Sequence, residues 1–323
     1  NKNIVNKSHL AKSIRFYNDA VECEKVGNLK SAEELYFKAI KINSTFFQAH
    51  YNLANVKKKV DELDEAITHF KKSIELKSDF LNAYNNLGGV LKDLGRIKEA
   101  EQNFKKVFEL NPNFKEAKIN LDSISELNKL ISIVKPSKKN KNDLNFISNV
   151  NTFKINRDVE PELINELYNI RTEELDKTGL YDARYGHGKF SNFKLFENNS
   201  VIIKKIKADL TTIMEQAVKS EIYIKESFFN ILKSGSGLRP HTHFGAFDKN
   251  IGYENQKFSL TYYLSIGDQK TDEPGILKFY DPKKEILPTN GLLLIFPANQ
   301  KHSAIYNGKE DRIMIGVNFY SLN

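Results

Sequence analysis

The sequence predicts two domains, a helical repeat solenoid followed by a barrel or sandwich of β-strands with one helix-covered sheet. Its 323 residues are enough for about two domains of the usual size, roughly 100–200 residues each. A 34-residue period runs through residues 13–112, whereas the C-terminal third consists of short strand-like segments separated by turns. Pro136 and a run of lysines break both patterns. We therefore expect domains at residues 1–127 and 146–323, joined by a linker at 128–145.

The repeat is defined by three kinds of residue at matching places. Small residues stand where two helices would touch, aromatic residues follow on the second helix, and turn residues separate the helices. These positions are, in order, Ala32, Ala66 and Ala100; Tyr36, Phe70 and Phe104; and Gly27, Asp61 and Gly95. Their period and chemistry resemble the tetratricopeptide repeat, which implies stacked helix pairs. Lys115–Leu127 is expected to be the helix that caps the stack.

Asparagine recurs at one position of every unit: Asn18, Asn52, Asn86 and Asn120 lie at 34-residue intervals. Stacked first helices line the concave groove of such a solenoid, so the four amides could bind an extended partner or substrate chain. An amide offers both a donor and an acceptor, which suits a peptide main chain. The column is similar to the asparagine ladder in the repeat domain of O-GlcNAc transferase. Local packing between repeats is the equally good alternative.

The C-terminal domain begins with helices and continues with strands. Residues 160–178 are predicted to be helical, and an apolar stripe predicts a second helix over Ile203–Ala217. Strands are expected at residues 223–232, 258–265, 275–279, 291–296, 302–306 and 312–320.

The last two strands are expected to form a hairpin. A three-residue loop with Gly308 in the left-handed position would pair Tyr306 with Glu310. One face would then carry His302, Ala304, Arg312, Met314, Gly316 and Asn318, and the other would be aliphatic and covered by the Ile203–Ala217 helix.

Three histidines and an arginine carry the chemistry of this domain. His241 and His243 alternate along an extended segment and so project from one strand face. A third histidine, His302, stands on a distant strand. Two ligands from one strand and a third from another are typical of a redox metal site with open positions. Arg312 supplies a permanent cation for a carboxylate, unless it forms a surface ion pair with a neighbouring acid.

These residues resemble the Fe(II)/2-oxoglutarate-dependent oxygenases, most closely the prolyl-hydroxylase-like branch. The resemblance covers roughly residues 228–320, through the segments Gly235–His241, Ser259–Leu264, Gly275–Pro282 and Gly291–Pro297. It implies a double-stranded β-helix (jelly-roll) that binds Fe(II), 2-oxoglutarate as co-substrate and dioxygen. His241 and His302 would be iron ligands, and Arg312 would bind the distal carboxylate of 2-oxoglutarate.

The chain departs from the family at the third ligand, where His243 replaces the usual Asp or Glu. His243 itself is the first candidate for that ligand, and Asp248 is the second. Three further residues are cofactor-binding candidates: Tyr262, Asn230 and Asn318. Strand alternation alone does not decide whether Tyr262 or its neighbour Tyr263 faces the co-substrate.

Composition and charge indicate the cellular setting of the protein and the kinds of partner it binds. The single cysteine, Cys23, excludes an internal disulfide and fits a reducing, cytoplasmic setting. No apolar run is long enough for a membrane span. The net charge of +8 is spread out without a basic–aromatic motif, which argues against nucleic acid as the partner.

Together with the asparagine column of the repeats, the resemblance implies a dioxygenase that hydroxylates a protein or peptide held by the repeat groove. Three alternatives remain open. The repeats could dock an unrelated partner while the barrel hydroxylates a small molecule. The barrel could be a three-histidine dioxygenase of the cupin type that needs no 2-oxoglutarate. It could also be catalytically silent, leaving the chain as a repeat scaffold.

Overall fold

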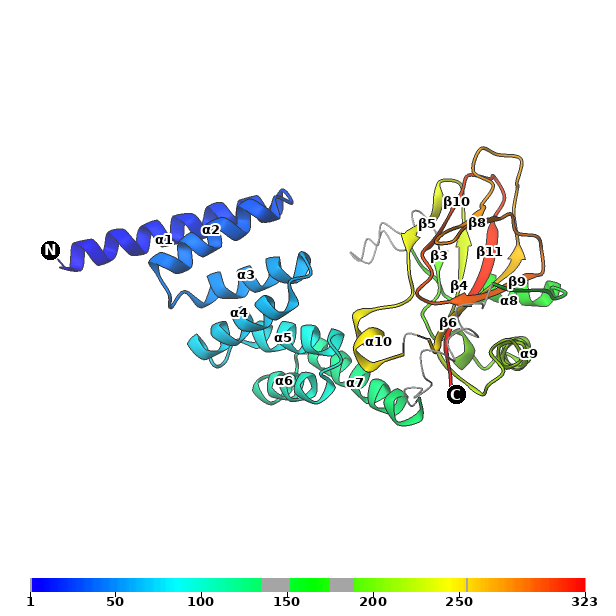
Figure 1. Cartoon of the computed structure of the whole chain (residues 1–323), viewed down its shortest axis with the longest axis horizontal. Helices are drawn as coiled ribbons and strands as arrows, with labels where there is room; N and C mark the ends of the chain where they lie inside the picture. The colour runs from blue at the N-terminus through cyan, green and yellow to red at the C-terminus, as the bar shows by residue number, and fades with distance from the viewer. Residues whose placement is uncertain (1, 135–151, 175–188, 254, 323) are drawn as a thin grey trace. The chain divides into compact units, whose positions relative to one another are not determined.

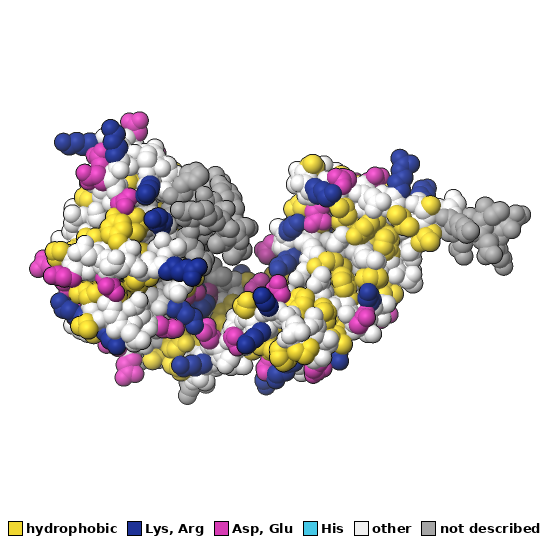
Figure 2. Space-filling model, turned by 180° about the vertical axis from the view of Figure 1, so that it is seen from behind, with side chains coloured by type: hydrophobic (Ala, Val, Ile, Leu, Met, Phe, Trp, Pro, Cys, Tyr) yellow, Lys and Arg dark blue, Asp and Glu magenta, His cyan; other side chains and the backbone are white. Residues whose placement is uncertain are grey.

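The computed structural model describes residues 2–134, 152–174, 189–253 and 255–322. The chain forms two compact units, Asn1–Lys129 and Leu130–Asn323 (Figure 1). Helices make up the first unit, and the second is rich in β-sheet. No helix in the described part is long and apolar enough to cross a membrane. On the face shown in Figure 2, basic and acidic side chains are interspersed.

The first unit is a stack of antiparallel helix pairs, as the repeat predicts. Its helices are α1 (Lys2–Lys25), α2 (Leu29–Ile42), α3 (Phe47–Lys59), α4 (Leu63–Leu76), α5 (Leu81–Asp93), α6 (Ile97–Leu110) and α7 (Lys115–Ile133). Small residues are required between helices, because a Cβ on Gly88 would lie only 2.6 Å from the ring of Phe104. The predicted turn residues all have positive φ: +78° at Gly27, +65° at Asp61 and +73° at Gly95.

Helix α7 is longer than the sequence suggested. It continues to Ile133, so the expected end at Leu127 and a linker starting at residue 128 were wrong. Its buried face carries Leu127 and Leu130, and the buried Val134 follows the last helical residue, so apolar burial continues beyond the predicted end. Residues 135–145 of the predicted linker lie outside the described residues.

Two antiparallel sheets build the second unit. The larger has the order β1-β9-β6-β11-β4-β3-β2, and the smaller has the order β5-β10-β7-β8. The larger sheet consists of β1 (Phe153–Asn156), β2 (Glu173–Glu174), β3 (Lys189–Phe190), β4 (Ile222–Leu232), β6 (Lys257–Ser265), β9 (Leu292–Pro297) and β11 (Arg312–Ser321). The smaller consists of β5 (Ser236–His241), β7 (Leu277–Tyr280), β8 (Lys283–Ile286) and β10 (His302–Tyr306).

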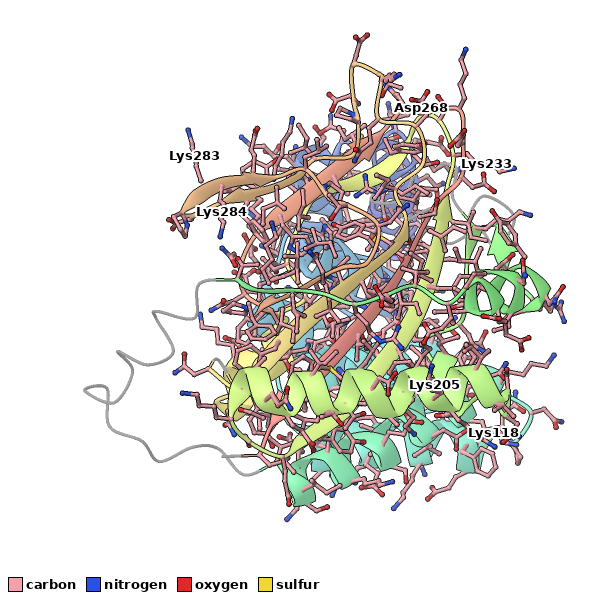
Figure 3. The ribbon with its side chains drawn as sticks, turned by 90° about the vertical axis from the view of Figure 1, so that its right-hand side faces the viewer. Lys118, Lys205, Lys233, Asp268, Lys283 and Lys284 are labelled. Carbon is pink, nitrogen blue, oxygen red and sulfur yellow. The ribbon has the colours of Figure 1, made fainter. Side chains whose placement is uncertain are left out.

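Helix α9 (Val201–Val218) covers the outer face of the larger sheet, as predicted (Figure 3, where Lys205 marks the helix). Its buried stripe, including Leu210 and Met214, packs in one core with Ile313 and Ile315 of β11. Burying such a side chain contributes about 1.5–3 kcal/mol relative to leaving it exposed. The other helices of this unit are α8 (Pro161–Asn169), the short α10 (Ala246–Ile251) and a 3-10 turn, η2 (Leu195–Glu197).

Helix α8 is shorter than the predicted helix 160–178. The backbone turns extended at Ile170 and enters β2 at Glu173. The predicted positions 175–178 lie outside the described residues.

A second core lies between the two sheets. Tyr263, Phe296 and Met314 contribute to it from the larger sheet, and Phe279 and Ala304 from the smaller. The cavity described below is lined from the same two facing surfaces.

The predicted pairing of the last two strands was wrong. Strand β10 pairs with β5 and β7, whereas β11 pairs with β4 and β6, so the chain crosses from one sheet to the other at residues 307–311. Tyr306 fixes this crossing, because its hydroxyl donates to the Glu310 carbonyl (2.5 Å) and accepts from the Asp268 N–H (2.8 Å). The residues predicted to share one face of the hairpin, from His302 to Asn318, nevertheless all line the cavity between the two sheets.

Candidate metal centre

Three histidines meet at one edge of the smaller sheet. His241 ends β5 and is paired with His302, the first residue of β10, while His243 lies two residues beyond β5. Their candidate ligand nitrogens all lie within 4.8 Å of one another. In the described residues this is the only such group of three or more histidine, cysteine or acidic side chains. Metal–nitrogen bonds of about 2.1 Å place ligand atoms up to about 4.2 Å apart, so small side-chain movements would complete the set.

One ring nitrogen of His302 is already bonded to the protein, which leaves Nε2 as its candidate ligand atom. Its Nδ1 is 3.0 Å from the Gln300 carbonyl, which accepts a hydrogen bond in the tautomer that carries a proton on Nδ1. Burial, and then the neighbouring His241, lower the pKa of His302 to about 4. The imidazole is therefore neutral near pH 7, the form that coordinates a metal.

Arg312 is buried in the same cavity, with 1% of its surface exposed. Its Nη1 donates to the Gly275 carbonyl (2.7 Å), and its guanidinium carbon lies 5.0 Å from the ring centre of Tyr263. No acidic side chain of the described residues forms an ion pair with it, and the neighbouring Asp311 instead accepts from the Tyr168 hydroxyl (2.8 Å). The surface ion pair considered from the sequence is therefore wrong.

One edge of the Arg312 guanidinium has no partner. Nε and Nη2 are both buried and make no hydrogen bond within the protein. These two nitrogens donate in parallel from the same edge, which matches the two oxygens of a carboxylate. Leaving such donors unsatisfied in a buried place is costly, so the arrangement favours an anionic ligand.

Gly275 is a site residue that the sequence did not single out. It has φ +83°, and a Cβ there would lie 1.3 Å from Nη1 of Arg312. Glycine is thus required where the backbone carbonyl closes on the guanidinium. The only signal in the sequence was a glycine at the start of a predicted strand.

The cavity between the sheets contains all three histidines, Arg312, Asn230 and Asn318 in its lining. Both polar atoms of the buried Asn230 side chain are without a partner. Asn318 is already satisfied, since it donates to Glu226 and accepts from Ser259, both at 2.8 Å. The cavity volume is about 20 Å³, enough for roughly one water.

Tyr262 does not lie in this cavity, so its prediction as a cofactor-binding residue was wrong. Its side chain belongs to the core beneath α9, where the hydroxyl donates to the Asp158 carbonyl and accepts from Arg157, both at 2.9 Å. Because side chains alternate along β6, Tyr263 faces the cavity instead.

Asp248 is likewise not part of the histidine group, so it was wrong as the second candidate ligand. Its carboxylate is buried and held by three donors: Lys257, the Tyr320 hydroxyl and the Gly245 N–H.

The asparagine column of the solenoid forms bonds between repeats. Asn52 Nδ2 donates to the hydroxyls of Tyr17 (3.0 Å) and Tyr36 (3.2 Å). The Tyr36 hydroxyl in turn donates to Glu24, which fixes Asn52 as the donor.

The next two units follow the same rule. Asn86 Nδ2 donates to the Tyr51 hydroxyl (3.0 Å) and to Asn55 (2.8 Å), and Asn120 donates to Asn85 (2.9 Å). Asn18 is exposed, and among the described residues it has no such bond. The column thus contributes to packing between repeats. At Asn52 and Asn86 both amide hydrogens are used, which leaves only the side-chain oxygen for a ligand.

Comparisons with known proteins identify the repeats. The tetratricopeptide repeat family matches residues 45–113. The TPR domain of Arabidopsis OM64 is 22% identical over 36% of this chain and 98% of that chain, with a TM-score of 0.36. The second TPR domain of human RPAP3, in complex with an HSP70 peptide, is 23% identical over 37% of this chain and 98% of its own, with a TM-score of 0.34. No curated protein matches the chain. The N-terminal region therefore carries tetratricopeptide repeats, followed by a β-sheet-rich region.

Proposed function

We propose that this chain is an Fe(II)- and 2-oxoglutarate-dependent dioxygenase that hydroxylates a protein or peptide, with its two facing sheets forming a double-stranded β-helix. One observation carries the proposal: a buried guanidinium with an unpartnered edge lines the same cavity as a three-histidine cluster. A cation held this way suits a ligand that is both anionic and close to a metal.

The residues present fit a redox metal. His241, His243 and His302 would hold it through neutral imidazole nitrogens, which suit iron. Iron, when bound, would supply the activation of dioxygen needed to oxidise a C–H bond of the substrate. The protein contributes by holding the ligands apart from bulk water, since His241 and His302 are both buried.

The co-substrate would be anchored by side chains that already face the cavity. The free edge of Arg312 would bind the distal carboxylate, and Asn230 Nδ2 would donate to another co-substrate oxygen. The cavity volume of about 20 Å³ is too small for the whole molecule, so lining side chains must move on binding. Met314 is suited to this because its unbranched side chain adapts easily.

The repeats support a polymeric substrate. An extended chain held by a solenoid would be presented to the barrel at a raised effective concentration. The side-chain oxygens of Asn52 and Asn86, whose amide hydrogens are used between repeats, would accept hydrogen bonds from main-chain N–H groups of that chain.

A second function is favoured by one observation. The histidine group contains no carboxylate, as expected for a three-histidine dioxygenase that needs no 2-oxoglutarate. The partnerless edge of Arg312 argues for the first function. A calorimetric titration with 2-oxoglutarate in the presence of Mn(II) separates the two, because only the first requires tight binding.

The decisive experiment measures metal binding and succinate formation together. The purified chain should bind one Fe(II), or Mn(II) in its place, and convert 2-oxoglutarate to succinate. His302→Ala should abolish both, and His243→Ala should weaken the metal if three histidines bind it. His69→Ala is the matched control, since that histidine lies in the solenoid. Undiminished metal affinity in His302→Ala would refute the site, and absence of succinate with metal bound would refute the activity.

A further inference from the structure

The second unit contains a buried ion pair between α10 and β6 that the proposed function does not use. Asp248 and Lys257 are 2% and 5% exposed, and Lys257 Nζ lies 2.8 Å from Asp248 Oδ2. Burying two charges is expensive and by itself contributes little to stability. A buried ion pair of this kind suggests a role beyond stability when its groups also hold a neighbouring backbone segment in place.

The carboxylate of Asp248 is tied to the larger sheet on one side. The Tyr320 hydroxyl donates to Oδ1, and Tyr320 is the cross-strand partner of Lys257 in the β11–β6 pair. Both donors therefore project from neighbouring positions of one rigid sheet.

On its other side the carboxylate holds the segment that follows the first two histidines. The Gly245 N–H donates to Asp248 Oδ2 (2.9 Å), and Gly245 is two residues from His243. His243 itself donates its N–H to the Ala298 carbonyl (2.9 Å), and the Ala298 N–H donates to the Lys257 carbonyl (3.0 Å). The backbone around His243 is thus attached to Lys257 twice, once through Asp248 and once through Ala298.

We propose that Asp248 and Lys257 are positioning residues for the metal centre, which fix residues 242–246 so that His243 faces the same ion as His241 and His302. The proposal rests on the metal site of the proposed function. His241 and His302 are paired within the smaller sheet, whereas His243 lies beyond the end of its strand. His243 is therefore the ligand that most needs an external support.

Loss of that support should weaken the metal in a defined way. Partners that orient a ligand typically change metal affinity by about 10–100-fold when removed. Asp248→Leu combined with Lys257→Met removes both charges together, so neither is left buried alone. The N–H of Gly245, an exposed residue, can then bond to water.

The test is a thermodynamic cycle with Co(II) alone as the probe, whose d–d absorption reports the ligand number. The double variant should bind Co(II) at least tenfold more weakly than the unchanged chain, with an altered d–d band. In a His243→Ala background the same double substitution should change the affinity less than twofold, because the ligand it supports is gone. Asp209→Asn, which weakens an ion pair with Arg157 beneath α9, is the control and should leave Co(II) affinity unchanged.

Two results would overturn the inference: an unchanged Co(II) affinity in the folded double variant, or an equal loss with and without His243. Asp248→Asn combined with Lys257→Met preserves the side-chain volume at position 248, leaves no charge buried alone, and provides a second, milder variant if the first does not fold. It should weaken Co(II) severalfold, and an unchanged affinity would again refute the positioning role. If the unchanged chain binds no Co(II), the proposed metal site fails as well, so the two failures are distinguishable.

Discussion

Replacing Arg312 by Met tests the carboxylate anchor while keeping most of the buried volume. In the structure Nη1 is committed to the Gly275 carbonyl, and only Nε and Nη2 are available to a ligand. The expected loss is therefore that of two charge-assisted hydrogen bonds. The metal should stay bound, because no histidine is altered.

The magnitude follows from that count. Hydrogen bonds to charged groups contribute about 1.5–3 kcal/mol each. Two at the lower end give about 3 kcal/mol, and about 1.4 kcal/mol corresponds to tenfold in affinity. Arg312→Met should thus weaken 2-oxoglutarate at least about a hundredfold. Arg312→Lys should recover only part of this, since an ammonium is a point charge rather than a planar fork.

The assay is calorimetry with Mn(II) present, comparing 2-oxoglutarate with 2-oxobutyrate, which lacks the distal carboxylate. The unchanged chain should bind 2-oxobutyrate about as weakly as Arg312→Met binds 2-oxoglutarate. In Arg312→Met the two ligands should bind equally. If the variant retains 2-oxoglutarate affinity within twofold, or still discriminates between the two acids, the anchor is elsewhere and the reasoning fails.

Three further predictions concern other parts of the chain. Gly275→Ala should weaken 2-oxoglutarate with the metal retained, because a Cβ there overlaps Arg312 Nη1; equal affinity by calorimetry would contradict the close approach. Burial, and then His50 at 3.1 Å, lower the pKa of His69 to about 4, below its unfolded value of about 6.5. The solenoid's stability should therefore be full above about pH 6.5 and decline as pH falls toward 4, read from the urea midpoint by circular dichroism, and His69→Gln should flatten the decline. Asn52→Ala should destabilise the solenoid by about 1 kcal/mol, because it removes two bonds to tyrosine hydroxyls. Thermal melting should show this loss in Asn52→Ala and not in the control Asn18→Ala, since Asn18 is exposed and has no such bond to a described residue.

The repeat could be predicted almost completely because its signal is periodic and local. Small residues such as Ala66 and turn residues such as Gly95 must recur wherever helices touch or reverse, so one sequence contains several copies of the same constraint. The end of α7 could not be predicted, because Leu130 and Val134 lie just beyond the last full repeat and have no copy to compare with.

The sequence predicts the candidate site where the alternation of side chains along a strand determines their direction. It does not predict which strands pair or which face of a strand a helix covers. The strand period correctly predicted that His302, Arg312 and Met314 point into one space, although they line it from two facing sheets. It could not show that β10 and β11 lie in different sheets, because turn chemistry does not report which strand is the neighbour. The choice between Tyr262 and Tyr263 likewise depends on which face of β6 meets α9, a tertiary fact.

The crossing of the chain between the sheets has a consequence for ligand size. His302 and Arg312 are ten residues apart in sequence, yet they lie on opposite walls whose spacing is set by the side chains packed between them. The distance between the guanidinium and a metal held as proposed by the histidines would therefore depend on core residues such as Leu277, Ala304 and Met314. Larger or smaller side chains at these positions would change the distance between the two walls. Under the proposed function, this would change the length of the dicarboxylic acid that fits between the histidines and Arg312 without altering either group.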